Sequence, residues 1–314
     1  MTPIVDALGP DEAVVVNVQF NACVVRLADG TLASATVRGR VRGRNKALGQ
    51  PVVVGDGVRF EREGAGAEER LVITEVGERR NMFSRRASGH DTSEQVMAAN
   101  LDQVVIVAAL VQPEFRAGFV DRVLAQCAHA GLPARLVLNK TDLAPDDAAP
   151  LLDDYAVAGV AGHAVCAKSG QGVEALHEVL HGLRSLFLGH SGVGKSSLLN
   201  ALEPGFDLLV GEVNAKTGKG RHTTTSATLL KPEGDVELID TPGMRAFGLW
   251  GIDSETLDHA WPEFVPFLGS CKFGDCAHEN EPGCAVRSAV AAGKVARRRY
   301  ESFLKLREEL RAEQ

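Results

Sequence analysis

Residues 186–202 read LFLGHSGVGKSSLLNAL, and they indicate the class of fold more clearly than the rest of the sequence. A Gly-X4-Gly-Lys-Ser pattern at residues 189–196 lies between an apolar strand-like run and a helical Leu-rich run. Glycines let backbone N–H groups surround a β-phosphate, the lysine reaches the β and γ oxygens, and the serine hydroxyl ligates Mg²⁺. The stretch predicts the phosphate-binding loop of an α/β domain, and the alternative is a glycine-rich turn that matches by chance.

The predicted nucleotide contacts of this loop are Gly189, His190, Ser191, Gly192, Val193, Gly194, Lys195, Ser196 and Ser197, with Ser196 also on Mg²⁺. Lys195 is expected on an exposed loop, so its removal should weaken phosphate binding more than folding. The motif alone does not separate ATP from GTP.

A base-reading motif, Asn-Lys-Thr-Asp at residues 139–142, follows the apolar run 136–138. Asp142 can accept both guanine N1–H and the N2 amino group, a donor pair that adenine lacks. Lys140 would cover the base and Asn139 would tie two nucleotide-binding loops together. The predicted guanine contacts are Asn139, Lys140, Thr141 and Asp142, with Ala167 and Lys168 from a Cys-Ala-Lys segment whose backbone N–H would reach guanine O6. The alternatives are a surface turn and an Asn-X-Thr glycosylation acceptor, and the absence of a signal-peptide pattern argues against the second.

Two further segments fit a GTPase. Residues 240–243, Asp-Thr-Pro-Gly, match the Asp-X-X-Gly element, in which Asp240 holds Mg²⁺ through water and the Gly243 N–H senses the γ-phosphate. Residues 218–225 form a Gly/Lys/Arg/Thr loop in which Thr223, Thr224 or Thr225 would complete the Mg²⁺ shell. Of the three, we predict Thr224 as the ligand. The alternative for this loop is a polar loop without a ligand.

The residue after Asp-X-X-Gly is Met244, where many GTPases have a water-orienting Gln. Slow hydrolysis by the isolated protein is therefore expected. His222 is the nearest polar candidate for a catalytic role, because a neutral imidazole can orient or accept from water near pH 7. A solvent-facing loop histidine is the alternative.

The motif order is unusual, because the base reader at 139 precedes the phosphate-binding loop at 189. Ordinary GTPases have the reverse order. A parallel sheet places all these loops at its C-terminal edge, so the sites still converge if the fold has been joined and reopened elsewhere. The order predicts a circularly permuted GTPase.

Three cysteines and one histidine fall within fourteen residues near the C-terminus. Cys271, Cys276, His278 and Cys284 make a complete tetrahedral set for one structural Zn²⁺, with no open position for water. Buried free cysteines beside a solvent histidine are the alternative.

Before residue 80, short Val-rich runs around the turn signal Asp29-Gly30, and again at 51–54, 58–60 and 71–76, predict a small β-barrel of about five strands. A basic strip within it, consisting of Arg38, Arg40, Arg42, Arg44 and Lys46, suits an RNA phosphate backbone. The alternative is a solvated edge strand. Lys294 and residues 297–299 make a second basic patch at the start of a final helical stretch from about 286 to 313.

Composition and charge exclude several classes of protein. The chain has 314 residues, 45% of them hydrophobic, and 34 basic against 41 acidic groups give a net charge of −7, so any RNA contact must be local. The longest apolar run, residues 104–111, is too short to cross a bilayer, and the first sixteen residues lack a signal peptide's pattern. We expect a soluble, monomeric, cytoplasmic protein that does not contact membranes.

The combination resembles the RsgA family, which are bacterial circularly permuted GTPases that assist maturation of the small ribosomal subunit. The resemblance rests on the Val-Arg-Gly-Arg strip, residues 54–58, residues 99–103, the permuted GTPase motifs and the Cys/His cluster. It implies an OB-fold RNA-binding barrel over residues 1–80, a permuted GTPase domain over 81–250 and a zinc-binding helical domain over 251–314. It also implies binding to the 30S subunit and its 16S rRNA. Because the γ-phosphate sensor is joined to the zinc module, docking on rRNA could order the loop that carries His222, which predicts ribosome-stimulated GTP hydrolysis followed by release.

Two other functions remain open at this stage. One is a GTP-binding RNA assembly scaffold whose hydrolysis is incidental, which multiple-turnover assays with and without ribosomal subunits separate from an enzyme. The other is a P-loop kinase or ATPase with an unrelated zinc module. Residues 139–142 argue against that kinase, and a comparison of GTP with ATP binding tests it.

Overall fold

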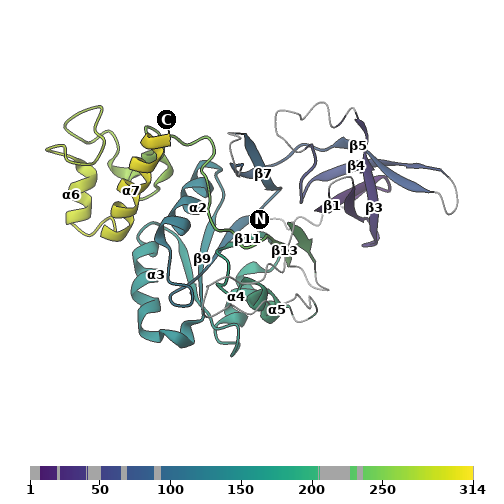
Figure 1. The fold of residues 1–314 in the computed structure, drawn as a ribbon, viewed down its shortest axis with the longest axis horizontal. Helices are drawn as coiled ribbons and strands as arrows, with labels where there is room; N and C mark the ends of the chain where they lie inside the picture. Colours follow the sequence, from purple (N-terminus) through teal and green to yellow (C-terminus); the bar gives the residue numbers. More distant parts are fainter. Residues whose placement is uncertain are drawn as a thin grey trace.

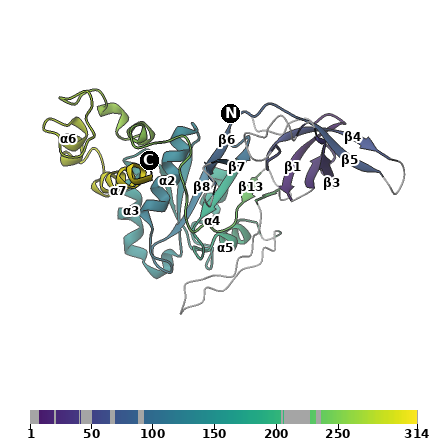
Figure 2. The ribbon, with the colours of Figure 1, turned by 45° about the horizontal axis from the view of Figure 1, so that its top comes forward.

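The computed structural model describes residues 8–19, 22–39, 41, 51–64, 69–87, 93–203, 205, 227–231 and 236–313. An N-terminal barrel and a C-terminal helical module lie at opposite ends of a central sheet that is covered by helices (Figures 1 and 2). This arrangement confirms the predicted fold class.

The barrel consists of five strands, β1 (Glu12–Val18), β2 (Cys23–Leu27), β3 (Leu32–Val37), β4 (Gly57–Glu63) and β5 (Arg70–Val76). They pair in the order β1-β2-β3-β5-β4, and a further pairing of β1 with β4 closes the barrel. The predicted turn joins β2 to β3: Gly30 has φ +84°, and the Asp29 carboxylate accepts the Thr31 N–H at 2.9 Å. Closure leaves a small apolar core inside the barrel, around Val15, Val25 and Ile73.

Residues 51–54, predicted as a strand, instead form a buried turn. The buried Asp56 carboxylate accepts the Val53 N–H at 2.8 Å, and its own N–H donates to the Val53 carbonyl at 3.2 Å. Gly55 has φ +90°, and a Cβ there would lie 2.3 Å from the Ala99 carbonyl oxygen. The hydrogen bonds of Asp56 with the neighbouring backbone stabilise a turn at this position, and they outweigh the preference of the apolar run for an extended strand.

A hairpin of β6 (Met82–Arg86) and β7 (Glu94–Ala99) connects the barrel to the central sheet. The sheet contains β8 (Gln103–Ala109), β9 (Ala134–Asn139), β10 (Ala161–Ala164), β11 (Arg184–Gly189), β12 (Thr228–Leu230) and β13 (Glu237–Asp240). Its order is β10-β9-β8-β11-β13-β12, parallel throughout except for the antiparallel β12. The C-terminal ends of the parallel strands therefore meet at one edge.

Helices cover both faces of the sheet: α2 (Ala117–His129), α3 (Ala148–Ala156), α4 (Val173–Leu180) and α5 (Lys195–Leu202). Along β8, Val104 and Ile106 join the core beneath α2 and α3, whereas Val105 and Val107 join the core beneath α4 and α5. Every residue of β8 and β11 is buried. Burial on both faces explains why these strands read as continuous apolar runs.

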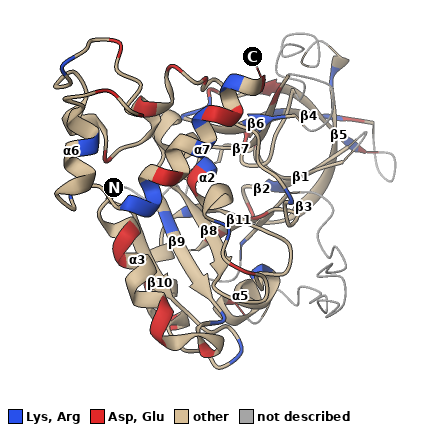
Figure 3. Ribbon diagram, turned by 60° about the vertical axis from the view of Figure 1, so that its left-hand side comes forward, with Lys and Arg blue, Asp and Glu red and all other residues tan. Residues whose placement is uncertain are grey.

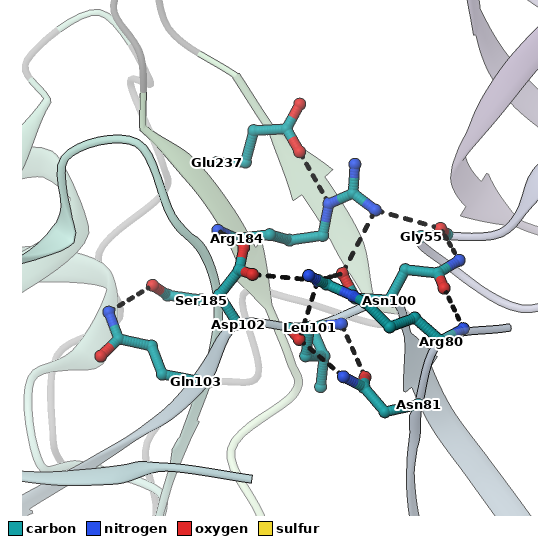
Figure 4. A network of polar contacts seen from close by, with 10 residues as sticks. All are labelled: Gly55, Arg80, Asn81, Asn100, Leu101, Asp102, Gln103, Arg184, Ser185 and Glu237. Atoms are coloured by element: carbon teal, nitrogen blue, oxygen red, sulfur yellow. Dashed lines mark hydrogen bonds and ion pairs between the residues drawn. The ribbon is translucent and has the colours of Figure 1, made fainter. Parts of the chain in front are cut away.

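The barrel is joined to the central sheet by strand pairing and by a buried polar network. β1 pairs with β12 at Asn17 and Thr228, so one sheet runs from the barrel into the central domain. In the network, Arg184 donates to Glu237 at 2.7 Å and to the Gly55 carbonyl at 3.2 Å (Figure 4). These contacts lie at the start of β11, on the edge of the sheet opposite the predicted nucleotide loops.

The C-terminal module contains two single-turn helices, η6 (Leu257–Ala260) and η7 (Val265–Phe267), followed by α6 (Ala285–Ala291) and α7 (Arg297–Glu313). The predicted final helix is thus broken in two, and Gly293 with φ +71° marks the break. Figure 3 shows basic and acidic residues along α7 beside α2. Among the described residues, no helix is both long enough and apolar enough to span a membrane.

Candidate functional site

The loop at residues 189–196 joins β11 to α5 at the C-terminal edge of the sheet. Its backbone requires glycine: Gly194 has φ +87°, and a Cβ there would lie 2.5 Å from the Asn139 side-chain nitrogen. His190, Ser191, Ser196 and Ser197 are partly buried, and Val193 is buried. The loop therefore presents backbone and short polar side chains at the start of a helix, as a phosphate site needs.

Lys195 is buried rather than exposed, contrary to the expectation from sequence. Its ammonium donates to the Asp240 carboxylate and to the Thr241 carbonyl. Burial lowers the pKa of Lys195, and the Asp240 charge opposes that shift. Because the lysine forms a buried ion pair, its removal would disturb folding as well as phosphate binding.

Asn139 lies between three loops. Its amide nitrogen donates to the Val193 and Gly194 carbonyls at 3.0 and 3.3 Å, and its oxygen accepts the Ala167 N–H at 3.0 Å. The segment from β9, the loop after β10 and the 189–196 loop are thereby brought together at one edge.

The rest of the base-reading segment borders the same edge. Lys140 has φ +61°, and its ammonium donates to the Gly192 carbonyl at 2.7 Å and to the Gln112 carbonyl. Burial lowers the pKa of Lys140. The Asp142 carboxylate is exposed and accepts from the Cys166 thiol at 3.2 Å. Of the remaining two residues, Thr141 is buried and Lys168 is exposed. The Thr141 hydroxyl donates to the Val165 carbonyl at 3.0 Å.

Residues 240–243 meet the phosphate-binding loop from the neighbouring strand β13. The Met244 N–H donates to the Gly189 carbonyl at 3.1 Å, and a Cβ on Gly243 would lie 3.1 Å from the Ser191 Cα. We call this junction, Gly189–Ser191 against Gly243 and Met244, the γ end of the site. It lies where an Asp-X-X-Gly glycine would meet a γ-phosphate.

Several predicted residues lie outside the described part of the chain. They are His222, Thr223, Thr224 and Thr225 of the loop 218–225, and Arg40, Arg42, Arg44 and Lys46 of the basic strip. The remaining member of the strip, Arg38, donates to Glu61 and Glu63 at 2.8 Å each. These carboxylates raise the pKa of Arg38 and neutralise part of its charge.

The second basic patch contains one residue that is not on the surface. Arg299 is 1% exposed and forms buried ion pairs with Asp121 of α2 and Glu263 of the C-terminal module. Arg299 therefore joins two parts of the structure and does not contribute to a surface patch.

The Cys/His cluster, consisting of Cys271, Cys276, His278 and Cys284, brings four ligand atoms within 4.8 Å of one another. The His278 Nδ1 atom lies 3.6 Å from the Cys271 sulfur and 3.4 Å from the Cys284 sulfur. Bond lengths of about 2.3 Å to sulfur and 2.0 Å to nitrogen give edges of roughly 3.5–3.8 Å in a tetrahedral site. The cluster therefore fits a metal ion.

The surroundings of the Cys/His cluster match those of a metal centre. Asp258 lies 3.4 Å from the other ring nitrogen of His278, which orients Nδ1 towards the sulfurs. The Ala285 N–H donates to the Cys271 sulfur at 3.3 Å, and the Arg287 N–H donates to the Cys284 sulfur at 3.4 Å. Such bonds stabilise thiolates. Sequence reasoning missed Asp258, because it lies twenty positions from His278.

Sequence reasoning also missed Arg116, which contacts the phosphate-binding loop from the start of α2. Its guanidinium lies 2.9 Å from His190 Nε2. Its only sequence signal is its place in the loop that follows the buried strand β8.

The base-reading segment follows β9, which precedes the phosphate-binding loop in the chain and lies two strands from β11 in the sheet. This order of the segments, together with the junction of their loops, defines a circularly permuted P-loop GTPase. Residues 76–250 match the sequence profile of the RsgA GTPase family. A Gemmatimonas aurantiaca protein named "Small ribosomal subunit biogenesis GTPase RsgA" is 44% identical over 90% of this chain and 91% of its own.

Two solved structures are similar over nearly the whole chain. YjeQ from Thermotoga maritima is 32% identical, with a TM-score of 0.74 over 96% of this chain and 98% of its own. YloQ, described as a circularly permuted GTPase, shares the fold at 24% identity, with a TM-score of 0.71 over 99% of this chain and 98% of its own. The chain belongs to the RsgA GTPase family and is a GTP-hydrolysing enzyme.

Proposed function

We propose that this enzyme hydrolyses GTP while bound to the small ribosomal subunit, assists late maturation of that subunit, and leaves it when hydrolysis is complete. The name of the Gemmatimonas relative supports the ribosomal role. The observation that best supports the proposed GTP site is the hydrogen bond from Asn139 to Val193. It joins the base-reading and phosphate-binding segments, although their order in the chain is permuted. The proposal places the enzyme in the cytoplasm as a monomer, with the domain boundaries given above.

In this proposal the guanine base lies against the edge formed by residues 139–142 and 166–168. Asp142 is exposed at that edge, so its carboxylate is available to two donors of one base. The phosphates lie along residues 189–197, where the buried Lys195 supplies the cation. This division of roles follows from the loops that Asn139 joins.

Two metal ions belong to the proposal. Mg²⁺ would be held by Ser196 and Thr224, with Asp240 acting through water, and it would neutralise phosphate charge. Zn²⁺ would be held by the Cys/His cluster, whose four ligands leave no position for water, so its role is structural.

The barrel and its basic strip, Arg38 to Lys46, are proposed to contact 16S rRNA. Because Arg38 is paired with Glu61 and Glu63, most of the attraction to phosphate must come from the other members of the strip. The His222 imidazole is proposed to orient the attacking water once the subunit is bound. A His222→Ala variant should then keep GTP-dependent subunit binding but lose the stimulated rate.

Sedimentation with purified ribosomal subunits tests the ribosomal half. The enzyme with a non-hydrolysable GTP analogue should pellet with small subunits and not with large ones, and GDP should release it. Equal pelleting with both subunits, or pelleting that does not depend on the nucleotide, would refute the proposal. Asp142→Ala serves as the matched control, because it should remove the nucleotide dependence and leave the barrel intact.

A further inference from the structure

Arg116 is an exposed arginine at the γ end of the site. It is the residue immediately before α2, and its guanidinium donates to His190 Nε2 at 2.9 Å. Because a guanidinium can only donate, Nε2 is the acceptor in this contact. Nδ1 in turn lies 3.1 Å from the Ser191 carbonyl.

This chain of contacts leads to the place where a γ-phosphate would lie. Ser191 is the residue that packs against Gly243, and His190 forms a backbone bridge with Met244. Arg116 therefore contacts the γ end through His190, whose side chain separates it from Gly243 and Met244.

The surroundings of Arg116 position its partner His190 and do not neutralise the guanidinium. Phe119, buried in the first turn of α2, packs its ring edge-on to His190 at 6.2 Å between centroids. Asp121, two residues further on, is fixed by its ion pair with Arg299. Among the described residues no carboxylate pairs with Arg116, so its charge is available to an anion at the γ end.

Besides a group that orients the attacking water in the place of Met244, hydrolysis needs a group that balances the negative charge of the transition state. In that reaction the water oxygen bonds to the γ-phosphorus and the β–γ bridging oxygen leaves on GDP with the bonding electron pair. The water protons pass to phosphate and solvent. Negative charge spreads over the γ oxygens and the bridging oxygen, and arginine stabilises such charge in many GTPases.

We propose that Arg116 is a catalytic arginine supplied by the enzyme itself, which transfers its N–H bonds from His190 to the phosphate oxygens in the transition state. This inference rests on the nucleotide site proposed above. A cavity of about 440 Å³ borders Arg116 on the side of residues 245–249 and α7.

Two other arginines make useful comparisons. Arg122 lies on α2, the helix that Arg116 precedes, and pairs with Glu309 of α7. Arg85 lies on β6, with its guanidinium 3.9 Å from the Met244 sulfur, and its Nε donates to Gln95 at 3.0 Å. Arg116 differs from both in contacting the phosphate-binding loop itself.

The test is single-turnover hydrolysis of radiolabelled GTP by the isolated enzyme, together with dissociation constants for fluorescent GDP and a non-hydrolysable GTP analogue. Arg116→Ala should lower the hydrolysis rate constant by about 100-fold, as for loss of one transition-state donor. Both dissociation constants should stay within about threefold of wild type. The matched control Arg122→Ala should retain the wild-type rate.

Free guanidinium distinguishes direct contact from an effect through His190. Millimolar guanidinium should restore part of the rate of Arg116→Ala and none of the loss in His190→Ala. His190→Ala should lose less than Arg116→Ala, and the double variant should match Arg116→Ala.

Three results would overturn the inference: a rate within threefold of wild type in Arg116→Ala, weaker GDP and GTP binding with an unchanged rate constant, or a 100-fold loss in Arg85→Ala instead. Failure of the wild type to bind GTP would instead count against the nucleotide site.

Discussion

Replacing Arg299 by methionine should weaken the attachment of the C-terminal module to the GTPase domain. Arg299 is 1% exposed, with its Nε 2.7 Å from Glu263 and one terminal nitrogen 2.5 Å from Asp121. Its guanidinium lies 4.3 Å from the centre of the Trp261 ring. Burial lowers the pKa of Arg299, but the two carboxylates outweigh burial and raise it, so the charge is kept.

The magnitude follows from what the substitution leaves behind. Methionine preserves much of the volume against Trp261 but strands two carboxylates that are 0% and 7% exposed. Removing one partner of a buried ion pair costs about 3–5 kcal/mol, because the remaining charge has no compensation. We expect that loss in the free energy of unfolding, measured by urea titration with tryptophan fluorescence, since Trp261 is fully buried beside Arg299.

Two further variants make the test specific. Arg298→Met removes an exposed pair with Asp154 and should cost less than about 1 kcal/mol. Adding Asp121→Asn and Glu263→Gln to Arg299→Met should recover at least half of the loss, because the stranded charges are gone. A loss from Arg299→Met no larger than that from Arg298→Met would refute the reasoning.

The remaining predictions concern the base, the metal and acid. Asp142→Asn should weaken GTP binding and favour xanthosine triphosphate, whose 2-position is a carbonyl; unchanged GTP preference in competition binding would refute the base-reader assignment. Metal analysis should find one zinc per chain, and chelation should remove the protection of α6 and α7 from hydrogen exchange while GDP still binds; protein free of zinc would contradict this. Burial would raise the pKa of Glu237, but Arg184 and Arg26 lower it below the usual 4.5. The stability that Glu237 contributes is therefore complete above about pH 4.5 and is lost as the pH falls through its lower folded value. The difference in urea midpoint between wild type and Glu237→Gln should shrink between pH 7 and pH 3, and a constant difference would be the contrary result.

The sequence carried enough information to predict the fold class and the family, because the deciding motifs are local. The Gly-X4-Gly-Lys-Ser pattern is set by the backbone conformation of one loop, and apolar runs such as 104–109 are set by burial on both faces of a parallel sheet. The Cys/His cluster is likewise contained in fourteen residues.

Most of the features that sequence reasoning missed depend on contacts between segments that are far apart in the sequence. The turn at residues 51–54 depends on the Asp56 carboxylate, which in turn pairs with Arg79 at 2.7 Å. The burial of Lys195 depends on Asp240, and that of Arg299 on Asp121, which is 178 positions away. Hydrophobic patterns cannot indicate which charged residues will be paired inside the protein.

Multiple-turnover GTP hydrolysis with and without purified subunits would show whether this permuted GTPase works on the small ribosomal subunit. We expect slow hydrolysis by the enzyme alone, strong stimulation by small subunits, none by large subunits, and no activity with ATP. Hydrolysis at the same rate with and without small subunits would contradict this expectation.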